Sequence, residues 1–273
     1  MESEGNSQGG ARVITVSSGK GGVGKTTATA NLGISLASLG NRVAVIDADI
    51  GLRNLDIIMG LENRIVYDLV DVVEGRSKLR QAMIKHKKFD DLFLIPAAQT
   101  RDKMAVSPED MTRVTEELRE DFDYILIDSP AGIERGFRNA LEPADEVLIV
   151  TNPEVSAVRD ADRIVGLIEA AEKGPGRLII NRLKTDLVRK GEMLSSDDVY
   201  DILGLAIIGI IPEDEAVLSA SNSGIPVALN MNSQAGMAFS HVARRIMGED
   251  VPFMNLDGNP GIFRRLMRLF DGR

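Results

Sequence analysis

The residues from Gly19 to Thr26 constrain this chain more than any other part of its sequence. They read GKGGVGKT and satisfy the pattern G-x-x-x-x-G-K-[ST]. Arg12–Ser17, just before them, is rich in β-branched residues, and Thr26–Leu39 carries apolar residues at helical spacing as far as Gly40. A glycine-rich loop between a strand and a helix is the context in which this pattern binds phosphate. The sequence therefore predicts a phosphate-binding loop.

Each residue type in this loop suits a nucleoside triphosphate. Glycines let backbone N–H groups turn toward phosphate oxygens without Cβ clashes, and the helix N-terminus adds its positive end. Lys25 can reach the β- and γ-phosphates, and the Thr26 hydroxyl can ligate magnesium, so ATP and Mg²⁺ are the expected cofactors. The alternative, a glycine-rich turn that binds nothing, fits the flanking pattern poorly. The predicted nucleotide-binding residues of the loop are Gly19, Lys20, Gly21, Gly22, Val23, Gly24, Lys25, Thr26 and Thr27.

Short and nearly continuous apolar runs recur along the chain, as in strands that are buried on both faces of a parallel sheet. They are Val43–Ile46, Leu92–Ile95, Tyr124–Ile127, Val147–Val150, Leu178–Ile180 and Ile207–Ile211. Helical patterns lie between several of them, including Pro108–Leu118, Val158–Ala171 and Ala235–Met247. This alternation predicts an α/β fold: a single-domain P-loop NTPase with a mainly parallel, twisted sheet and helices on both faces.

Composition narrows the class of protein further. The 273-residue chain has no cysteine, which excludes disulfides and thiolate metal sites. Its formal charge of −9 argues against a body built mainly to coat nucleic acid. No run approaches the roughly 18 apolar residues of a membrane span, and the first ten residues lack the apolar stretch of a signal peptide. We therefore expect the protein in the cytosol.

Three aspartates follow predicted strands and so belong near the phosphates. Carboxylates at the carboxyl ends of parallel strands point into the crevice where such sheets bind ligands. Asp128 is expected to hold the hydration shell of the magnesium ion, Asp47 to support that shell and Asp49 to orient the attacking water. The loops Gly51–Asp56 and Ser129–Gly132 then resemble switches that respond to the γ-phosphate. The alternative is that these aspartates cap loops or helices. The predicted metal-binding residues are Thr26, Asp47 and Asp128.

The end of the chain carries a different signal. At helical spacing, the six apolar side chains of the segment IFRRLMRLF at Ile262–Phe270 fall within an arc of about 160°, opposite its three arginines. The segment predicts an amphipathic helix after a linker at 255–261. Its expected membrane-contacting residues are Ile262, Phe263, Arg264, Arg265, Leu266, Arg268, Leu269 and Phe270. The remaining divisions are a polar leader at 1–10, the ATPase domain at 11–254 and the tail at 262–273.

Two interpretations of this tail remain open. A terminal amphipathic helix can dock on its own domain. It can also lie in the interface of a membrane that contains anionic lipids, where basic and bulky apolar faces both contribute. A helix this short is marginal in water, so the second interpretation has it ordering on the membrane, with two copies in a dimer holding better than one.

Several longer segments resemble one known family. The loop sequence KGGVGKTT, with its early lysine at Lys20, resembles the deviant Walker A motif of the MinD/ParA family. The resemblance to the MinD branch of that family, bacterial ATPases of division-site selection, runs from about Arg12 to Phe270. It is also carried by DADIGLRNLD at Asp47–Asp56, PAAQTRDK at Pro96–Lys103, DSPAGIE at Asp128–Glu134 and TNPEVS at Thr151–Ser156.

The resemblance implies roles for individual residues of the site. In the family the early lysine reaches across a dimer interface to the partner's nucleotide, and Lys20 is the matching position. Lys20, Lys25 and Asp49 are thus the expected catalytic residues, with slow intrinsic turnover. The segments that hold adenine in the family match Asn181 and Pro212-Glu213-Asp214. Asn181 offers an amide for the base edge, although an asparagine there can simply be a turn residue.

The resemblance also implies partners and a location. It predicts an ATP-dependent homodimer that binds the cytoplasmic face of the membrane through anionic lipids and is released by hydrolysis. It predicts recruitment of the septum inhibitor MinC and, in many members, stimulation by MinE. The family's partner surface includes the helix that matches Ser156–Arg163. Its candidate contacts, which can equally be a solvated helix face, are Arg159, Asp160, Asp162 and Arg163.

Three alternatives stay open at this point. A flagellar-number regulator is a related membrane ATPase. A ParA-type partition ATPase would bind DNA through basic residues when dimeric, which the acidic body and the tail disfavour. A scaffold that binds ATP without hydrolysing it is the non-enzyme alternative.

Overall fold

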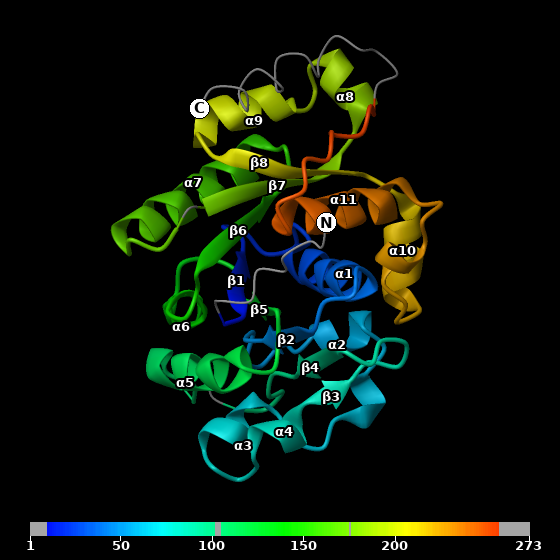
Figure 1. Cartoon of the computed structure of the whole chain (residues 1–273). Helices are drawn as coiled ribbons and strands as arrows, with labels where there is room; N and C mark the ends of the chain where they lie inside the picture. Colours follow the sequence, from blue (N-terminus) through cyan, green and yellow to red (C-terminus); the bar gives the residue numbers. More distant parts are fainter. Residues whose placement is uncertain (1–9, 102–104, 175, 257–273) are drawn as a thin grey trace, which may run out of the picture.

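The computed structural model describes residues 10–101, 105–174 and 176–256. One sheet of eight strands, in the order β3-β4-β2-β5-β1-β6-β7-β8, forms the centre of this part of the chain (Figure 1). All neighbouring strands are parallel except β3, which runs antiparallel to β4. The strands are β1 Arg12–Ser17, β2 Val43–Asp47, β3 Ile84–Lys85, β4 Leu92–Ile95, β5 Tyr124–Asp128, β6 Glu146–Thr151, β7 Gly176–Leu183 and β8 Ala206–Pro212.

Helices cover both faces of this sheet. One apolar cluster joins the sheet to α1, α2, α10 and α11, and two others join the opposite face to α3, α4 and α5 and to α6, α7 and α9. The helices are α1 Lys25–Ser38, α2 Leu55–Ile58, α3 Leu69–Val73, α4 Leu79–Ala82, α5 Pro108–Arg119, α6 Arg135–Leu141, α7 Val155–Ala170, α8 Thr185–Lys190, α9 Ser196–Leu203, α10 Glu215–Asn222 and α11 Gln234–Ile246, with 3-10 turns η1 Glu62–Arg64 and η2 Val227–Leu229. The predicted single-domain α/β fold is confirmed.

Strand β1 shows why the apolar runs lack alternation. Val13 packs in the cluster with α5, whereas Ile14 packs in the cluster with α1. Both residues are fully buried because helices lie on each side of the sheet. A strand in this position needs apolar residues throughout.

The structure corrects several element boundaries. Apolar spacing predicted a helix from Val158, but the helix begins at Val155. The prediction missed the first turn because Val155 and Ser156 are exposed and add nothing to the apolar periodicity. Strand β3 was not predicted, since its two residues are too few to show a period. Strand β7 extends past Ile180 to Leu183 through irregular pairing with β8. Apart from the added edge strand β3, these differences shift the ends of elements and leave the order of the predicted elements unchanged.

Some predictions fall on residues outside the described ranges. They are the leader except Gly10, Asp102 and Lys103 of one family-like segment, and the tail with residues 257–261 of its linker. The division of the chain into leader, linker and tail therefore stays a prediction. None of the helices in the described part combines the length and the apolar character that crossing a bilayer requires.

Candidate nucleotide-binding site

The glycine-rich loop connects the C-terminal end of the central strand β1 to the first residue of α1. Two of its glycines are required by close approach. A Cβ on Gly19 would lie 2.1 Å from the carbonyl oxygen of Asp160 on α7, and a Cβ on Gly24 would lie 2.2 Å from Nδ2 of Asn181. Gly24 also has a φ of 97°, in the left-handed region that favours glycine. The loop is thus held between α7 and the end of β7.

Lys25 and Asp128 form a buried ion pair beneath this loop. Lys25 Nζ lies 2.9 Å from Asp128 Oδ1, and the two side chains are 6% and 1% exposed. Thr29 on α1, which sequence analysis missed, donates its hydroxyl to the same oxygen at 3.1 Å. In the sequence, Thr29 is marked only by being a small polar residue one helical turn after Lys25. Strand β5 and helix α1 are therefore joined at the point where phosphates would enter.

The same aspartate is suited to a hydrated cation. Asp128 Oδ2 is buried and has no hydrogen-bond partner among the described residues. Thr26, the predicted metal-ligating hydroxyl, accepts a hydrogen bond from Lys25 Nζ at 3.3 Å. No group of three or more His, Cys, Asp or Glu side chains in the described part of the chain forms a metal cage. This arrangement fits Mg²⁺, which keeps several waters and is usually held by one or two carboxylates plus substrate phosphates.

Asp47 links the end of β2 to the first predicted switch loop. Its two carboxylate oxygens accept backbone N–H groups from Asp49 at 3.0 Å and from Leu55 at 3.3 Å. Burial, followed by the nearby negative charge of Asp128, raises the pKa of Asp47 to about 8. The pair of aspartates therefore forms an acidic site in which a cation would favour the charged form of both.

The two predicted switch loops face each other across a cavity of about 330 Å³. Asp49, the predicted water-orienting residue, lines this cavity together with Leu52, Pro130 and Glu134. Arg53 in the first loop has a φ of 36°, and its Nε lies 3.1 Å from Asp56 Oδ2, whose side chain is 1% exposed. A strained residue that is held by a buried partner is typical of segments with a second conformation.

The predicted base-binding residues come together at a cavity of about 780 Å³ beside the loop. Asn181 donates Nδ2 to the carbonyl oxygen of Val23 at 2.7 Å, which leaves its amide oxygen as the acceptor for a base. Arg182, which sequence analysis missed, also lines the cavity and has a φ of 58°. Among the residues predicted to bind nucleotide, this cavity is lined by Gly24, Thr27, Asn181, Pro212, Glu213 and Asp214.

Asp214 has a structural role at this cavity. Its Oδ1 accepts the N–H of Ala216 at 2.9 Å and so caps α10, while Oδ2 accepts the Ser233 hydroxyl at 2.6 Å. Burial opposes ionisation, but these hydrogen bonds outweigh it and lower the pKa of Asp214. The side chain anchors the wall of the cavity, and a direct contact with the base stays a prediction.

Lys20 is exposed, and its Nζ donates to the hydroxyl oxygen of Ser156 on α7 at 3.4 Å. The candidate partner residues lie further along the same helix. Arg159, Asp162 and Arg163 are exposed, and Asp160 Oδ1 lies 3.5 Å from Arg163 Nη1. Because Asp160 also contacts Gly19 through its backbone, this surface is physically continuous with the phosphate loop.

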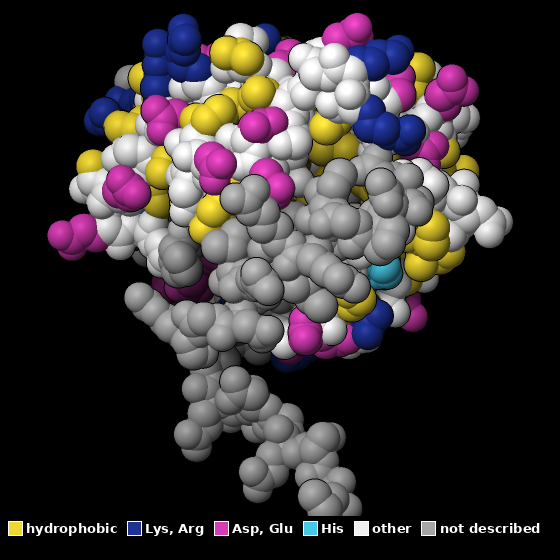
Figure 2. All heavy atoms as spheres, turned by 90° about the horizontal axis from the view of Figure 1, so that it is seen from above, with side chains coloured by type: hydrophobic (Ala, Val, Ile, Leu, Met, Phe, Trp, Pro, Cys, Tyr) yellow, Lys and Arg dark blue, Asp and Glu magenta, His cyan; other side chains and the backbone are white. Residues whose placement is uncertain are grey.

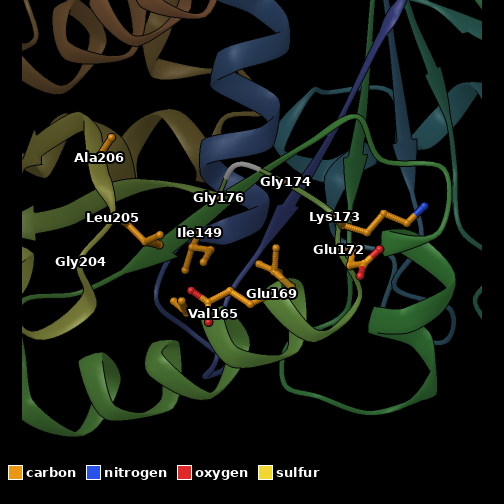
Figure 3. A pocket seen from close by; sticks show the side chains of 11 residues that line it. Ile149, Val165, Glu169, Glu172, Lys173, Gly174, Gly176, Gly204, Leu205 and Ala206 are labelled. Carbon is orange, nitrogen blue, oxygen red and sulfur yellow. The ribbon is translucent and has the colours of Figure 1, made fainter. Parts of the chain in front are cut away.

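A third cavity, of about 500 Å³, lies at the opposite end of the sheet, where β7 and β8 begin. Figure 3 shows Val165, Glu169 and Leu205 around it, together with Glu172 and Lys173. Its lining is largely apolar and includes none of the predicted nucleotide-binding residues. We therefore place the nucleotide at the phosphate loop alone.

Comparison with known proteins agrees with this geometry. The family described as AAA domain matches residues 11–180. The septum site-determining protein MinD of Bacillus subtilis is 52% identical over 263 residues, 95% of this chain and 98% of that protein. The MinC:MinD cell division protein complex of Aquifex aeolicus matches with 50% identity and a TM-score of 0.84, covering 90% of this chain and 99% of that one. MinD of Pyrococcus horikoshii complexed with Mg-ADP matches at 29% identity with a TM-score of 0.78, covering 86% and 96%.

Proposed function

Because this chain belongs to the MinD family of septum site-determining ATPases, we propose that it couples Mg²⁺-dependent ATP hydrolysis to reversible dimerisation on the membrane, where it recruits a division inhibitor. The observation that carries the proposal is the buried pair of Lys25 and Asp128 beneath the phosphate loop, with Asp47 and Asp49 at the end of the next strand. These residue types meet the needs of phosphoryl transfer, which are positioning and charge neutralisation.

Magnesium would be held by Thr26, Asp128 and the phosphates, with Asp47 supporting its waters, and it would supply charge neutralisation at the phosphates. The related MinD of Pyrococcus horikoshii was solved in complex with Mg-ADP, which supports Mg²⁺ as the cofactor. Lys25 is paired with Asp128 beneath the loop, and phosphate oxygens would compete for the same ammonium group. Asp49 would orient the attacking water from the rim of the cavity between the switches. Turnover is slow until a partner completes the site.

The partner that completes the site is a second copy of the chain. Lys20 is exposed beside the phosphate loop and can therefore reach a nucleotide on another protomer. Three exposed apolar side chains lie on or next to the switch loops and at the start of α7. Leu52 is on the first loop, Ile133 directly follows the second and Val155 begins α7, and they are 61%, 48% and 63% exposed. Burying these side chains between two copies would favour association once ATP orders the loops.

The inhibitor partner would bind α7. A solved relative is a MinC:MinD complex, and Arg159, Asp160, Asp162 and Arg163 offer it a charged, partly exposed surface. A MinE-type activator at the same helix would act on the phosphate loop through the contact between Asp160 and Gly19. Charge complementarity of this kind sets specificity and association rate more than affinity.

The tail supplies the membrane contact in this proposal. Four arginines against Asp271 give 262–273 a side-chain charge of +3 in a chain of −9, which suits anionic lipid, and each arginine contributes about 1 kcal/mol near such a surface. On the described part of the face in Figure 2, acidic and basic side chains are interspersed. That mixture gives no support to a DNA-binding face. The protein is thus cytoplasmic and reversibly peripheral on the cytoplasmic face of the membrane.

Co-sedimentation with anionic vesicles tests this proposal. Full-length protein and a chain that ends at Gly261 are compared with ATP, with ADP and without nucleotide. We expect pelleting that needs both ATP and the tail, and full-length Phe263→Glu should stay in the supernatant while still binding ATP. Equal pelleting in all nucleotide states would contradict the coupling to dimerisation. Salt-sensitive DNA binding with no pelleting would favour a partition ATPase instead.

A further inference from the structure

Helices α2 and α10 meet through two glycines. Gly60 follows α2 and Gly224 follows α10, with φ values of 65° and 61°. A Cβ on Gly60 would lie 2.4 Å from the carbonyl oxygen of Gly224, and a Cβ on Gly224 would lie 2.9 Å from Cα of Gly60. Real Cβ atoms do not approach backbone atoms this closely, so the two backbones are in direct contact. Because no side chain lies between them, a movement of one backbone would displace the other.

Each glycine ends a segment that begins at the nucleotide site. On one side, α2 starts at Leu55, whose N–H is bonded to the carboxylate of Asp47, and the first switch loop runs directly into it. On the other side, α10 starts at the cap residue Asp214 and lines the base cavity with Val217, Leu218, Ser219, Ser221 and Asn222. The glycine contact therefore joins the element that holds the base to the element that follows the switch.

The chain beyond Gly224 is fixed to the phosphate-loop helix. Asn31 on α1 is 1% exposed and accepts the N–H of Ala228 at 2.8 Å, while its Nδ2 donates to the carbonyl oxygen of Thr27 at 2.7 Å. Helix α10 itself has no buried residue. Its residues Ala216, Val217 and Ala220 are only partly buried against the core, so α10 is held less firmly than the fully buried helices, and a shift of α10 would reach Gly60 through the glycine contact.

We propose that Gly60 and Gly224 are positioning residues that transmit occupancy of the base cavity to the first switch loop, Gly51–Asp56, which follows Asp49 in the chain. This inference rests on the proposed ATPase function and deepens it. The base draws α10 toward Asn181, the Gly224 backbone presses on Gly60, and α2 sets the loop 51–56 for hydrolysis. Phosphates bound without a base leave the loop in its starting position.

Amide hydrogen exchange on the wild-type protein tests the link without any substitution. Mg²⁺ is present throughout, and saturating ADP is compared with saturating pyrophosphate, which fills the phosphate loop but leaves the base cavity empty. We expect ADP to protect both 215–222 and 55–60 more than pyrophosphate does. If ADP adds protection at 215–222 only, the base does not reach α2 and the inference is wrong.

Matched glycine variants test the effect on turnover. Gly224→Ala and Gly60→Ala introduce a methyl group at the contact, whereas Gly204→Ala, with a φ of 64° and nothing within 4 Å of its Cβ, carries similar backbone strain in open space. We expect kcat for ATP to fall about 10- to 100-fold in both contact variants, with a much smaller change in ATP affinity, and to stay near wild type in Gly204→Ala.

The outcomes separate this inference from the function on which it rests. Wild-type protein that does not hydrolyse ATP would overturn the proposed function. Active wild-type protein, with contact variants that match Gly204→Ala in kcat, would overturn the role of the glycines alone. Should both contact variants fail to fold, the exchange experiment on wild-type protein decides.

Discussion

At the scale of single residues, the Lys25–Asp128 pair places two opposite charges directly beneath the phosphate loop. A buried carboxylate is costly without a partner, and here one lysine neutralises it while a threonine donates to it. The lysine is therefore already positioned below the loop. Phosphate oxygens at the loop would compete with Asp128 for its ammonium group.

Replacing Lys25 should consequently affect both binding and stability. We expect Lys25→Ala to lose nucleotide binding and to lower the nucleotide-free stability by about 3–5 kcal/mol, because Asp128 is left buried and unpaired. Urea denaturation measures the stability, and titration with a fluorescent ADP measures binding. The double variant Lys25→Ala/Asp128→Asn is the control, since it removes both charges and should recover much of the stability without recovering binding. A single variant as stable as wild type would show that the pair carries no weight in the folded protein.

At the scale of elements, α7 connects a surface to the site. Its exposed side bears Arg159, Asp162 and Arg163, while its backbone at Asp160 contacts Gly19 of the loop. The helix predicted from apolar spacing began three residues too late, at Val158, whereas the family resemblance already included Ser156, the residue that contacts Lys20. A protein that binds this helix would therefore lie close to the phosphate loop, with only the backbone of α7 between them.

Charge reversal on α7 tests the partner surface. We expect Arg159→Glu to weaken binding of a MinC-type inhibitor by about tenfold or more, because a favourable charge contact becomes unfavourable. Glu169→Lys reverses an exposed charge near the other end of the same helix and should leave the affinity unchanged. Surface plasmon resonance with ATP-loaded protein measures both. Equal loss in the two variants would indicate a general charge effect and remove Arg159 from the interface.

At the scale of the whole molecule, the proposed function links ATP binding, dimerisation and membrane binding in one cycle that hydrolysis would reset. The loop that carries Asp49 lies at the proposed dimer face, near the exposed Leu52 and Ile133. A loss of water positioning would stop the cycle after assembly. The dimer would then persist, since nothing would remove the γ-phosphate that orders its switches.

Asp49→Ala should therefore bind ATP normally, lower phosphate release by about 100-fold or more and accumulate as a dimer. Light scattering after gel filtration in ATP measures the mass, and a coupled phosphate assay measures turnover. Asp201→Ala, at an exposed carboxylate on α9, is the matched control and should behave as wild type. Turnover at the wild-type rate in Asp49→Ala would remove this residue from the mechanism.

The sequence by itself determined the phosphate loop, the alternation of strands and helices, and the aspartates at strand ends, because these depend on contacts between near neighbours. The family resemblance, and not the local pattern, assigned Asn181 and Pro212–Asp214 to the base, and the structure places them at one cavity. The amphipathic tail is likewise a local pattern, and its role stays a prediction because it lies outside the described residues.

Only the tertiary structure decided which groups far apart in the sequence form ion pairs, hydrogen bonds or packing contacts. Lys25 and Asp128 are 103 positions apart, and Asn31 and Ala228 are 197 apart. Periodicity does not encode strand order, so it did not show Thr29 beside Asp128 or Gly60 against Gly224. The physical reason is that such pairs are selected by packing of the whole sheet, whose order is set by the combined burial of many side chains and by no single segment.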